Sequence, residues 1–187
     1  RDWWTDFWQL STKVPPLTQI AAAITQLIFG TGGDRATLVN SFFSAILLVS
    51  VYGLGIQLFS AEVGLWAAGI CQLIPGLYKL RLDFLLDYPL TAVVTLCFWC
   101  LTVWKSQNSK VKSQNKFRIP NSEFRISSWF WAIAFGISLG LALLVKQTAL
   151  FFLFVPIVWT GVETIRKPHI GRICQFAIAL LLSAIVF

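Results

Sequence analysis

The sequence predicts an all-α fold, a polytopic bundle of transmembrane helices, and three observations lead to it. The 187 residues are 57% hydrophobic and 12% charged, whereas soluble domains carry about 25% charged residues. The apolar residues gather in runs that approach the length of about 17–25 residues a helix needs to cross a bilayer. These runs lack the apolar–polar alternation of membrane strands, so we expect helices.

Six apolar runs are the expected spans, with flanking residues completing the shorter ones. They cover residues 36–59, 62–79, 88–104, 128–145, 147–164 and 173–187. The sixth run is cut by the end of the sequence, the chain starts at Arg1, and it contains no Met. We therefore interpret residues 1–187 as a single transmembrane domain that is a fragment of a longer protein.

Residues 17–29, LTQIAAAITQLIF, are expected to form a helix of another kind. Apolar residues recur there at helical spacing, with Thr and Gln on the opposite face. The prolines at 15–16 favour a helix start, and GTGG at 30–33 favours its end. We predict an amphipathic helix that lies in the membrane interface, within an outer loop of residues 1–35.

The distribution of charge predicts the sidedness of the spans. Residues 105–127 contain the tetrapeptide KSQN twice and are expected to be a solvated cytoplasmic linker. With the loop at 163–172 and the turn at 60–62, this side has nine basic and three acidic residues, against six and five on the other. By the positive-inside rule the first side is the cytoplasm. This bias, and not nucleic-acid binding, accounts for the net charge of +7.

The cysteines and the single histidine do not predict a metal or redox centre. Four cysteines lie in apolar runs: Cys71, Cys97, Cys100 and Cys174. CFWC has the C-x-x-C spacing, but no His or second Cys pair is near, so we interpret all four as small buried hydrophobic residues. His169 lies beside Pro168 in a cytoplasmic loop, where we expect it to be solvated.

Charged residues gather on the outer side, at the ends of the apolar runs. Asp83 and Asp87 are four residues apart and would share a helix face, where their repulsion favours a nearby cation or metal. The candidate cations are Lys79, Arg81 and Lys146. Alternatively, these are ordinary helix-end charges, and DYP is an N-cap with Pro89 in the first turn. The spacing alone leaves both interpretations open.

Three stretches, in order, resemble the landmarks of a known family: STKVPPLTQIAAAITQLIFG, LIPGLYKLRLDFLLDYPLTAVVTL and GISLGLALLVKQTALFFLFVP. They are similar to a K-x-P-P-L-like element that opens an interfacial helix, a D-x-P-L-T element that opens a span, and a G-L-x-x-x-x-K element that closes one. The family is that of the GT-C membrane glycosyltransferases, in the branch of protein O-mannosyltransferases and the lipid A aminoarabinose transferase. The resemblance covers nearly all of residues 12–160.

The resemblance implies a reaction and its partners. A sugar passes from a polyprenyl-phosphate carrier to an acceptor at the outer membrane face, with inversion at the anomeric carbon. The acceptor is a protein, a lipid or a glycan, and the location expected is a bacterial plasma membrane. Some family members bind a divalent metal, for which this sequence has no clear ligand set.

The resemblance also implies roles for residues of this chain. Lys13 and Lys146 correspond to lysines expected to bind the carrier phosphate, as point charges. Asp87 is expected to organise the site by pairing with a lysine or a bound cation, together with Asp83 and Arg81. The sequence departs from the family at KVPP, where Val14 separates the lysine from the prolines.

The catalytic base is not identified by the sequence. The family's principal catalytic aspartate lies well upstream of the paired prolines, so we expect it outside this chain. Asp2 and Asp6, in RDWWTDFW, are weak candidates for a secondary acid, and the alternative is an aromatic interfacial anchor with incidental charges. Two other classes of protein remain alternatives, a secondary transporter and a non-catalytic membrane protein. The transporter alternative uses Pro156, Gly136 and Gly140 as helix-loosening positions.

Overall fold

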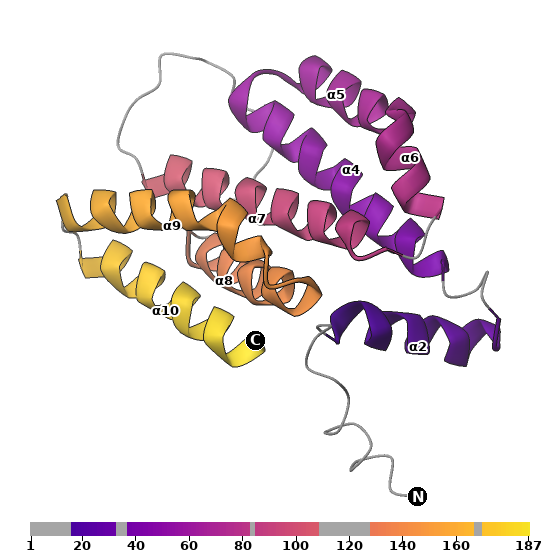
Figure 1. Ribbon diagram of the computed structural model, residues 1–187. Helices are drawn as coiled ribbons and strands as arrows, with labels where there is room; N and C mark the ends of the chain where they lie inside the picture. The colour runs from indigo at the N-terminus through magenta and orange to yellow at the C-terminus, as the bar shows by residue number, and fades with distance from the viewer. Residues whose placement is uncertain (1–15, 33–36, 83–84, 109–127, 167–169) are drawn as a thin grey trace, which may run out of the picture.

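The structure, a computed structural model, is an all-α bundle, as the sequence predicts (Figure 1). It describes residues 16–32, 37–82, 85–108, 128–166 and 170–187. These residues form eight helices and no strand: α2 (Leu17–Phe29), α4 (Leu38–Leu58), α5 (Ala61–Leu73), α6 (Pro75–Leu82), α7 (Asp87–Asn108), α8 (Ser128–Val145), α9 (Ala149–Arg166) and α10 (Ile170–Val186).

Four of the described helices, α4, α7, α8 and α9, are long and apolar enough to cross a membrane. Helices α5 and α6 satisfy the same criterion only when they are taken together, and they meet at a 61° bend. The bend has a local cause, because Pro75 has no N–H to donate and forces the preceding residue out of the helical region. Ile74 accordingly has an extended backbone, with φ −65° and ψ 116°. The run expected at 62–79 is therefore two helices joined at a bend, a geometry found in broken spans and in re-entrant loops.

The helices pack as a row in the order α5, α4, α7, α8 and α10 (Figure 1). The core lies along this row and includes Phe43 of α4, Trp104 of α7 and Phe135 of α8. Helix α9 makes only a few contacts with α7, α8 and α10, so much of its apolar surface is exposed. In a membrane protein, exposed apolar side chains of this kind contact lipid.

Glycines allow two of these pairs to approach closely. A Cβ added to Gly55 of α4 would overlap the backbone of Gly64 of α5, and one added to Gly136 of α8 would overlap the backbone of Ala179 of α10. Gly140, one turn further, lies against Ser183 and Val186 in the same way. Small residues four apart are a known means of packing membrane helices. Gly136 and Gly140 thus serve helix packing, which accounts for them without a transporter.

Helix α2 has the bounds predicted from the sequence, and it contacts α4 and α8. Its small side chains face the bundle: Thr18 and Ala22 are buried. Its large apolar side chains point outward, and Leu27 is 85% exposed. This orientation is the one expected of a helix whose apolar face is covered by lipid.

Candidate functional site

An ion pair joins the start of α7 to the turn between α8 and α9. The Lys146 ammonium donates a hydrogen bond to Asp87 Oδ1 at 2.6 Å. The two residues are 59 positions apart in the sequence, and both side chains are about half-exposed. The structure therefore brings together one predicted site-organising residue and one predicted phosphate-binding residue.

The backbone on the lysine side is fixed by a tight turn. The Lys146 N–H donates to the Ala142 carbonyl at 3.1 Å, and the Lys146 carbonyl accepts from the Ala149 N–H at 2.9 Å. Val145 and Ala149, on either side of the turn, have no exposed surface. Lys146 thus extends from a turn whose flanking residues are anchored in the core.

The backbone on the aspartate side is the first turn of α7. The Thr91 hydroxyl donates to the Asp87 carbonyl at 2.8 Å, and the Leu90 N–H donates to the Leu86 carbonyl at 3.0 Å. Tyr88, which follows Asp87, is 2% exposed. A carboxylate in the first turn also interacts favourably with the helix dipole. Asp87 is thus a helix-end charge that also pairs with Lys146, and it is the first residue of α7 rather than the N-cap that the alternative interpretation expected.

The ion pair between Lys146 and Asp87 leaves N–H donors of Lys146 available to bind an anion. Ion pairs with this exposure contribute about 0–1 kcal/mol to stability, because water screens them. An ammonium has three N–H donors, and Asp87 accepts from one of them. Two donors of Lys146 can therefore reach an anion while Asp87 holds the third.

Arg81 has different partners. Its Nη1 donates to Gln72 Oε1 of α5 at 2.7 Å, and its backbone carbonyl accepts from Asn40 Nδ2 of α4 at 2.9 Å. In the described part of the chain no ion pair joins Arg81 to Asp87, whose partner is Lys146. These contacts do not test the site-organising role that the resemblance implies for Arg81.

Five residues singled out in the sequence lie outside the described residues: Asp2, Asp6, Lys13, Asp83 and His169. The described residues also contain no cluster of three or more His, Cys, Asp or Glu side chains that could hold a metal ion. Asp87 is the carboxylate at the described site, and it is engaged by a lysine. The possible divalent metal stays an expectation from the resemblance.

The cysteines are arranged in part as expected. Cys97 and Cys100 are buried, and Cys97 Sγ donates to Ser138 Oγ of α8 at 3.2 Å. Cys71 is partly buried, whereas Cys174 is exposed. The prediction of burial is therefore wrong for Cys174, because α10 turns that face away from α8.

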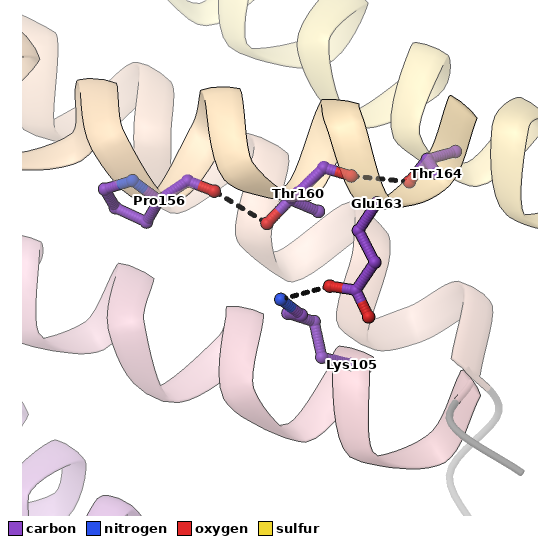
Figure 2. A network of polar contacts seen from close by, with 5 residues as sticks. All are labelled: Lys105, Pro156, Thr160, Glu163 and Thr164. Atoms are coloured by element: carbon purple, nitrogen blue, oxygen red, sulfur yellow. Dashed lines mark hydrogen bonds and ion pairs between the residues drawn. The ribbon is translucent and has the colours of Figure 1, made fainter. Parts of the chain in front are cut away.

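Sequence reasoning missed a second ion pair, at the other end of α7. Lys105 and Glu163 of α9 are joined at 2.6 Å (Figure 2). On α9 the Thr160 hydroxyl donates to the Pro156 carbonyl at 2.7 Å, and the Thr164 hydroxyl to the Thr160 carbonyl at 2.8 Å (Figure 2). The available signal is that Lys105 and Glu163 carry opposite charges on one predicted membrane side, where the sequence predicts loops.

A buried polar network lies beside this second pair. Trp104 Nε1 donates to Gln175 Oε1 at 2.8 Å, and Gln175 Nε2 donates to Ser128 Oγ at 3.0 Å. The Trp104 ring stacks with Phe135 and with Phe176, at centroid distances of 6.4 and 6.1 Å. A glutamine within a predicted apolar span was the signal in the sequence, since buried amides need partners.

The two ion pairs are separated by almost the whole of α7. Asp87 and Lys105 are 18 residues apart on one helix, which corresponds to about 27 Å at 1.5 Å per residue. The hydrocarbon core of a bilayer is about 30 Å thick. A helix that spans the membrane therefore places the two pairs near opposite surfaces.

One protein family matches nearly the whole of this chain. Residues 4–185 match the family described as dolichyl-phosphate-mannose-protein mannosyltransferase. The chain matches none of the curated proteins and none of the solved structures with which it was compared. Because the family match covers nearly the whole chain and several helices can span a membrane, the chain belongs to the dolichyl-phosphate-mannose-protein mannosyltransferase family and is a multi-pass membrane glycosyltransferase of the GT-C type.

Proposed function

We propose that this chain forms part of the active site of an enzyme that moves a sugar from a polyprenyl-phosphate carrier to an acceptor, at the non-cytoplasmic membrane face, with inversion. The family description supports the donor class, since dolichyl phosphate mannose is a polyprenyl-phosphate sugar, and it supports a protein as acceptor. A lipid or glycan acceptor is the alternative. The observation that carries the proposal is the ion pair between Asp87 and Lys146.

In the proposed sugar transfer, Asp87 and Lys146 each have a role. The acceptor hydroxyl attacks the anomeric carbon, the bond from that carbon to the carrier phosphate oxygen breaks, and the phosphate leaves with one more negative charge. The two remaining N–H donors of Lys146 can stabilise that charge, which is a large catalytic effect when the donors are already in place. Asp87 holds the ammonium in position through its 2.6 Å contact.

The remaining parts of the site are assigned by resemblance. Lys13 is the second phosphate-binding residue, and Asp83 helps to organise the site. A general base must take the proton of the acceptor hydroxyl, and we do not assign it to a described residue. Asp2 and Asp6 stay as weak candidates for a secondary acid. A bacterial plasma membrane is the proposed location.

The charge distribution supports the assignment of the Asp87 end to the non-cytoplasmic side. The Lys105 end is continuous with the basic segments 105–127 and 163–172, which the positive-inside rule places in the cytoplasm. Between these two ends, α7 contains no Asp, Glu, Lys, Arg or His. Charged groups at the ends of a span favour chemistry on a lipid headgroup over passage of a solute through the bilayer.

The test is release of the carrier by the full-length protein in proteoliposomes. A labelled polyprenyl-phosphate sugar is supplied, and free polyprenyl phosphate is measured for the unsubstituted protein, Lys146→Gln and the matched control Lys105→Gln. Each variant removes one ammonium from an ion pair at one end of α7. We expect Lys146→Gln to lower the release rate by about 100-fold, the effect of losing one charge-stabilising donor, while Lys105→Gln stays within about twofold.

Two outcomes contradict the proposal. Absence of release with every carrier sugar, in the presence of acceptor peptides and glycans, contradicts the donor class. Equal rates for Lys146→Gln and the unsubstituted protein contradict the assignment of the site.

A further inference from the structure

The bend between α5 and α6 encloses a polar cluster that the sugar-transfer chemistry does not use. We call residues 72–82 the elbow; it contains the 61° break of this span. Gln72 lies at the end of α5 and Arg81 near the end of α6, and the two side chains meet across the bend at 2.7 Å. The elbow therefore places a cation within a span that is otherwise mostly apolar.

The position of Arg81 is fixed from several directions. Asn40 Nδ2 of α4 donates to the Arg81 carbonyl at 2.9 Å, which holds the backbone. Gln72 Nε2 donates to Ser44 Oγ of α4 at 3.3 Å, so the partner of the guanidinium is itself held. The Arg81 guanidinium carbon lies 5.3 Å from the centroid of the Tyr78 ring, within the range of a cation–π interaction. Such a site is pre-organised before any ligand arrives.

The charge of Arg81 is not neutralised by the described residues. A guanidinium has five N–H donors, and the described contact of this one is with a neutral amide. The ion pairs of the described chain involve Lys105 and Lys146, not Arg81. A half-buried cation next to lipid is costly unless an anion accompanies it. The elbow therefore has the properties of an anion-binding site.

The depth of the elbow matches that of lipid phosphates. Helix α4 has 21 residues, or about 31 Å of rise, close to the thickness of the hydrocarbon core. Asn40, in the first turn of α4, contacts the elbow, so the elbow lies near one surface of the membrane. The neighbouring side chains are apolar and exposed, with Leu73 79%, Leu82 57% and Tyr78 50% exposed. Acyl chains can therefore cover the surroundings of the cation.

We propose that the elbow binds the phosphate of a membrane phospholipid, with Arg81 as the residue that binds the anion. The guanidinium can donate two parallel hydrogen bonds to phosphate oxygens, a geometry for which arginine is well suited. A phospholipid fits better than the carrier, because Arg81 is held by α4 and α5, whereas the proposed carrier site is held by α7 and the turn after α8. The bound phosphate would complete the polar cluster that ties the broken span to α4.

The experiment measures lipid binding by native mass spectrometry of the delipidated, full-length protein. One arm titrates phosphatidylglycerol and the other polyprenyl phosphate. Gln72→Glu places a carboxylate beside the guanidinium with almost no change of shape, and Arg81→Gln removes the charge. Arg166→Gln is the matched control, since it removes an exposed arginine in the last turn of α9. We expect the dissociation constant for phosphatidylglycerol to rise about tenfold or more in both elbow variants and to stay unchanged in the control.

The outcomes separate this proposal from the proposed function, because neither arm measures sugar transfer. The proposal is supported if the elbow variants lose phosphatidylglycerol affinity and keep that for polyprenyl phosphate. It is overturned if phosphatidylglycerol binds both variants as well as it binds the unsubstituted protein. It is also overturned if affinity for polyprenyl phosphate falls, alone or together with that for phosphatidylglycerol. Gln72→Glu keeps an acceptor for Arg81 Nη1, so a loss of lipid affinity in this variant is not explained by loss of that contact and unfolding of the bend.

Discussion

The two ends of α7 carry the same kind of interaction in different surroundings. At each end a lysine and a carboxylate meet at 2.6 Å, with similar exposure: 37% and 51% for Lys146 and Asp87, and 33% and 40% for Lys105 and Glu163. Beside the second pair, Trp104 is 1% exposed and stacks on two rings. Beside the first pair lies a turn that projects a lysine from the core.

The difference teaches that an ion pair does not reveal its role by its own geometry. At the Lys105 end, the buried Trp104–Gln175–Ser128 network already ties α7 to α8 and α10, so the ion pair adds little to stability. At the Asp87 end, the polar contacts of Asn40, Gln72 and Arg81 link α4, α5 and α6 rather than α7, and Asp87 accepts from one of the three N–H donors of Lys146. We therefore assign a structural role to the Lys105 end of α7 and a role in sugar transfer to the Asp87 end.

The largest effect on turnover is expected from Asp87→Asn. This change removes the charge that orients the Lys146 ammonium, and we expect turnover of a polyprenyl-phosphate sugar to fall about 100-fold. The free energy of unfolding should change by less than about 1 kcal/mol, because the pair is exposed. Turnover assays and unfolding in detergent check the two parts, with Glu163→Gln as the matched control. Normal turnover by Asp87→Asn would contradict the distinction between the ends.

Trp104→Ala tests the structural role of the other end. Loss of a fully buried aromatic ring that stacks on Phe135 and Phe176 is expected to lower the free energy of unfolding by about 3 kcal/mol. Trp66→Ala is the control, since Trp66 on α5 is 72% exposed, and should cost less than about 0.5 kcal/mol. Similar losses for both tryptophans would show that the stack does not fix the Lys105 end.

Gln175→Leu tests the polar network alone. It removes the acceptor of Trp104 Nε1 and the donor to Ser128 Oγ, and we expect a loss of about 1 kcal/mol, as for hydrogen bonds between membrane helices. Trp104→Phe removes the donor of the same hydrogen bond, Trp104 Nε1. The double variant should lose less free energy of unfolding than the sum of the losses in the two single variants. A loss equal to that sum would mean that the hydrogen bond between Trp104 and Gln175 contributes nothing.

The smallest effect is expected from Lys105→Gln. An exposed pair of this kind contributes between about 0 and 1 kcal/mol, and a glutamine can still donate to Glu163. Unfolding in detergent at low and high salt measures the contribution, which should shrink as salt screens the charges. A loss above about 2 kcal/mol would mean that the ion pair, and not the tryptophan stack, holds this end.

The sequence predicts the features that depend on local pattern. The bounds of α2 follow from helical periodicity between Pro16 and Gly30, and the fold class follows from apolar runs. Asp87 and Lys146 each lie in a motif that resembles the family, and the sequence offers their pairing as one of several alternatives, which the structure contains. The bend at Pro75 was missed, although IPG is a strong local signal of a break.

The features that the sequence could not predict are contacts between distant segments. Lys105 and Glu163 are 58 residues apart, and Trp104 and Gln175 are 71 apart. Nothing in either local pattern indicates which side chain will lie opposite, because that depends on the packing of α7 against α8, α9 and α10. The same holds for Arg81, whose partner Gln72 is set by the angle of the bend.

The most direct test of the account is the sidedness of the two ends of α7, measured by labelling with a membrane-impermeant thiol reagent. Single cysteines are placed at the exposed positions Gln147 and Gln107, in a full-length protein whose native cysteines are replaced. The account predicts that Gln147→Cys is labelled in intact cells and that Gln107→Cys is labelled only after the membrane is permeabilised. Labelling of Gln147→Cys only after permeabilisation would contradict the assignment of the Asp87–Lys146 site to the non-cytoplasmic face.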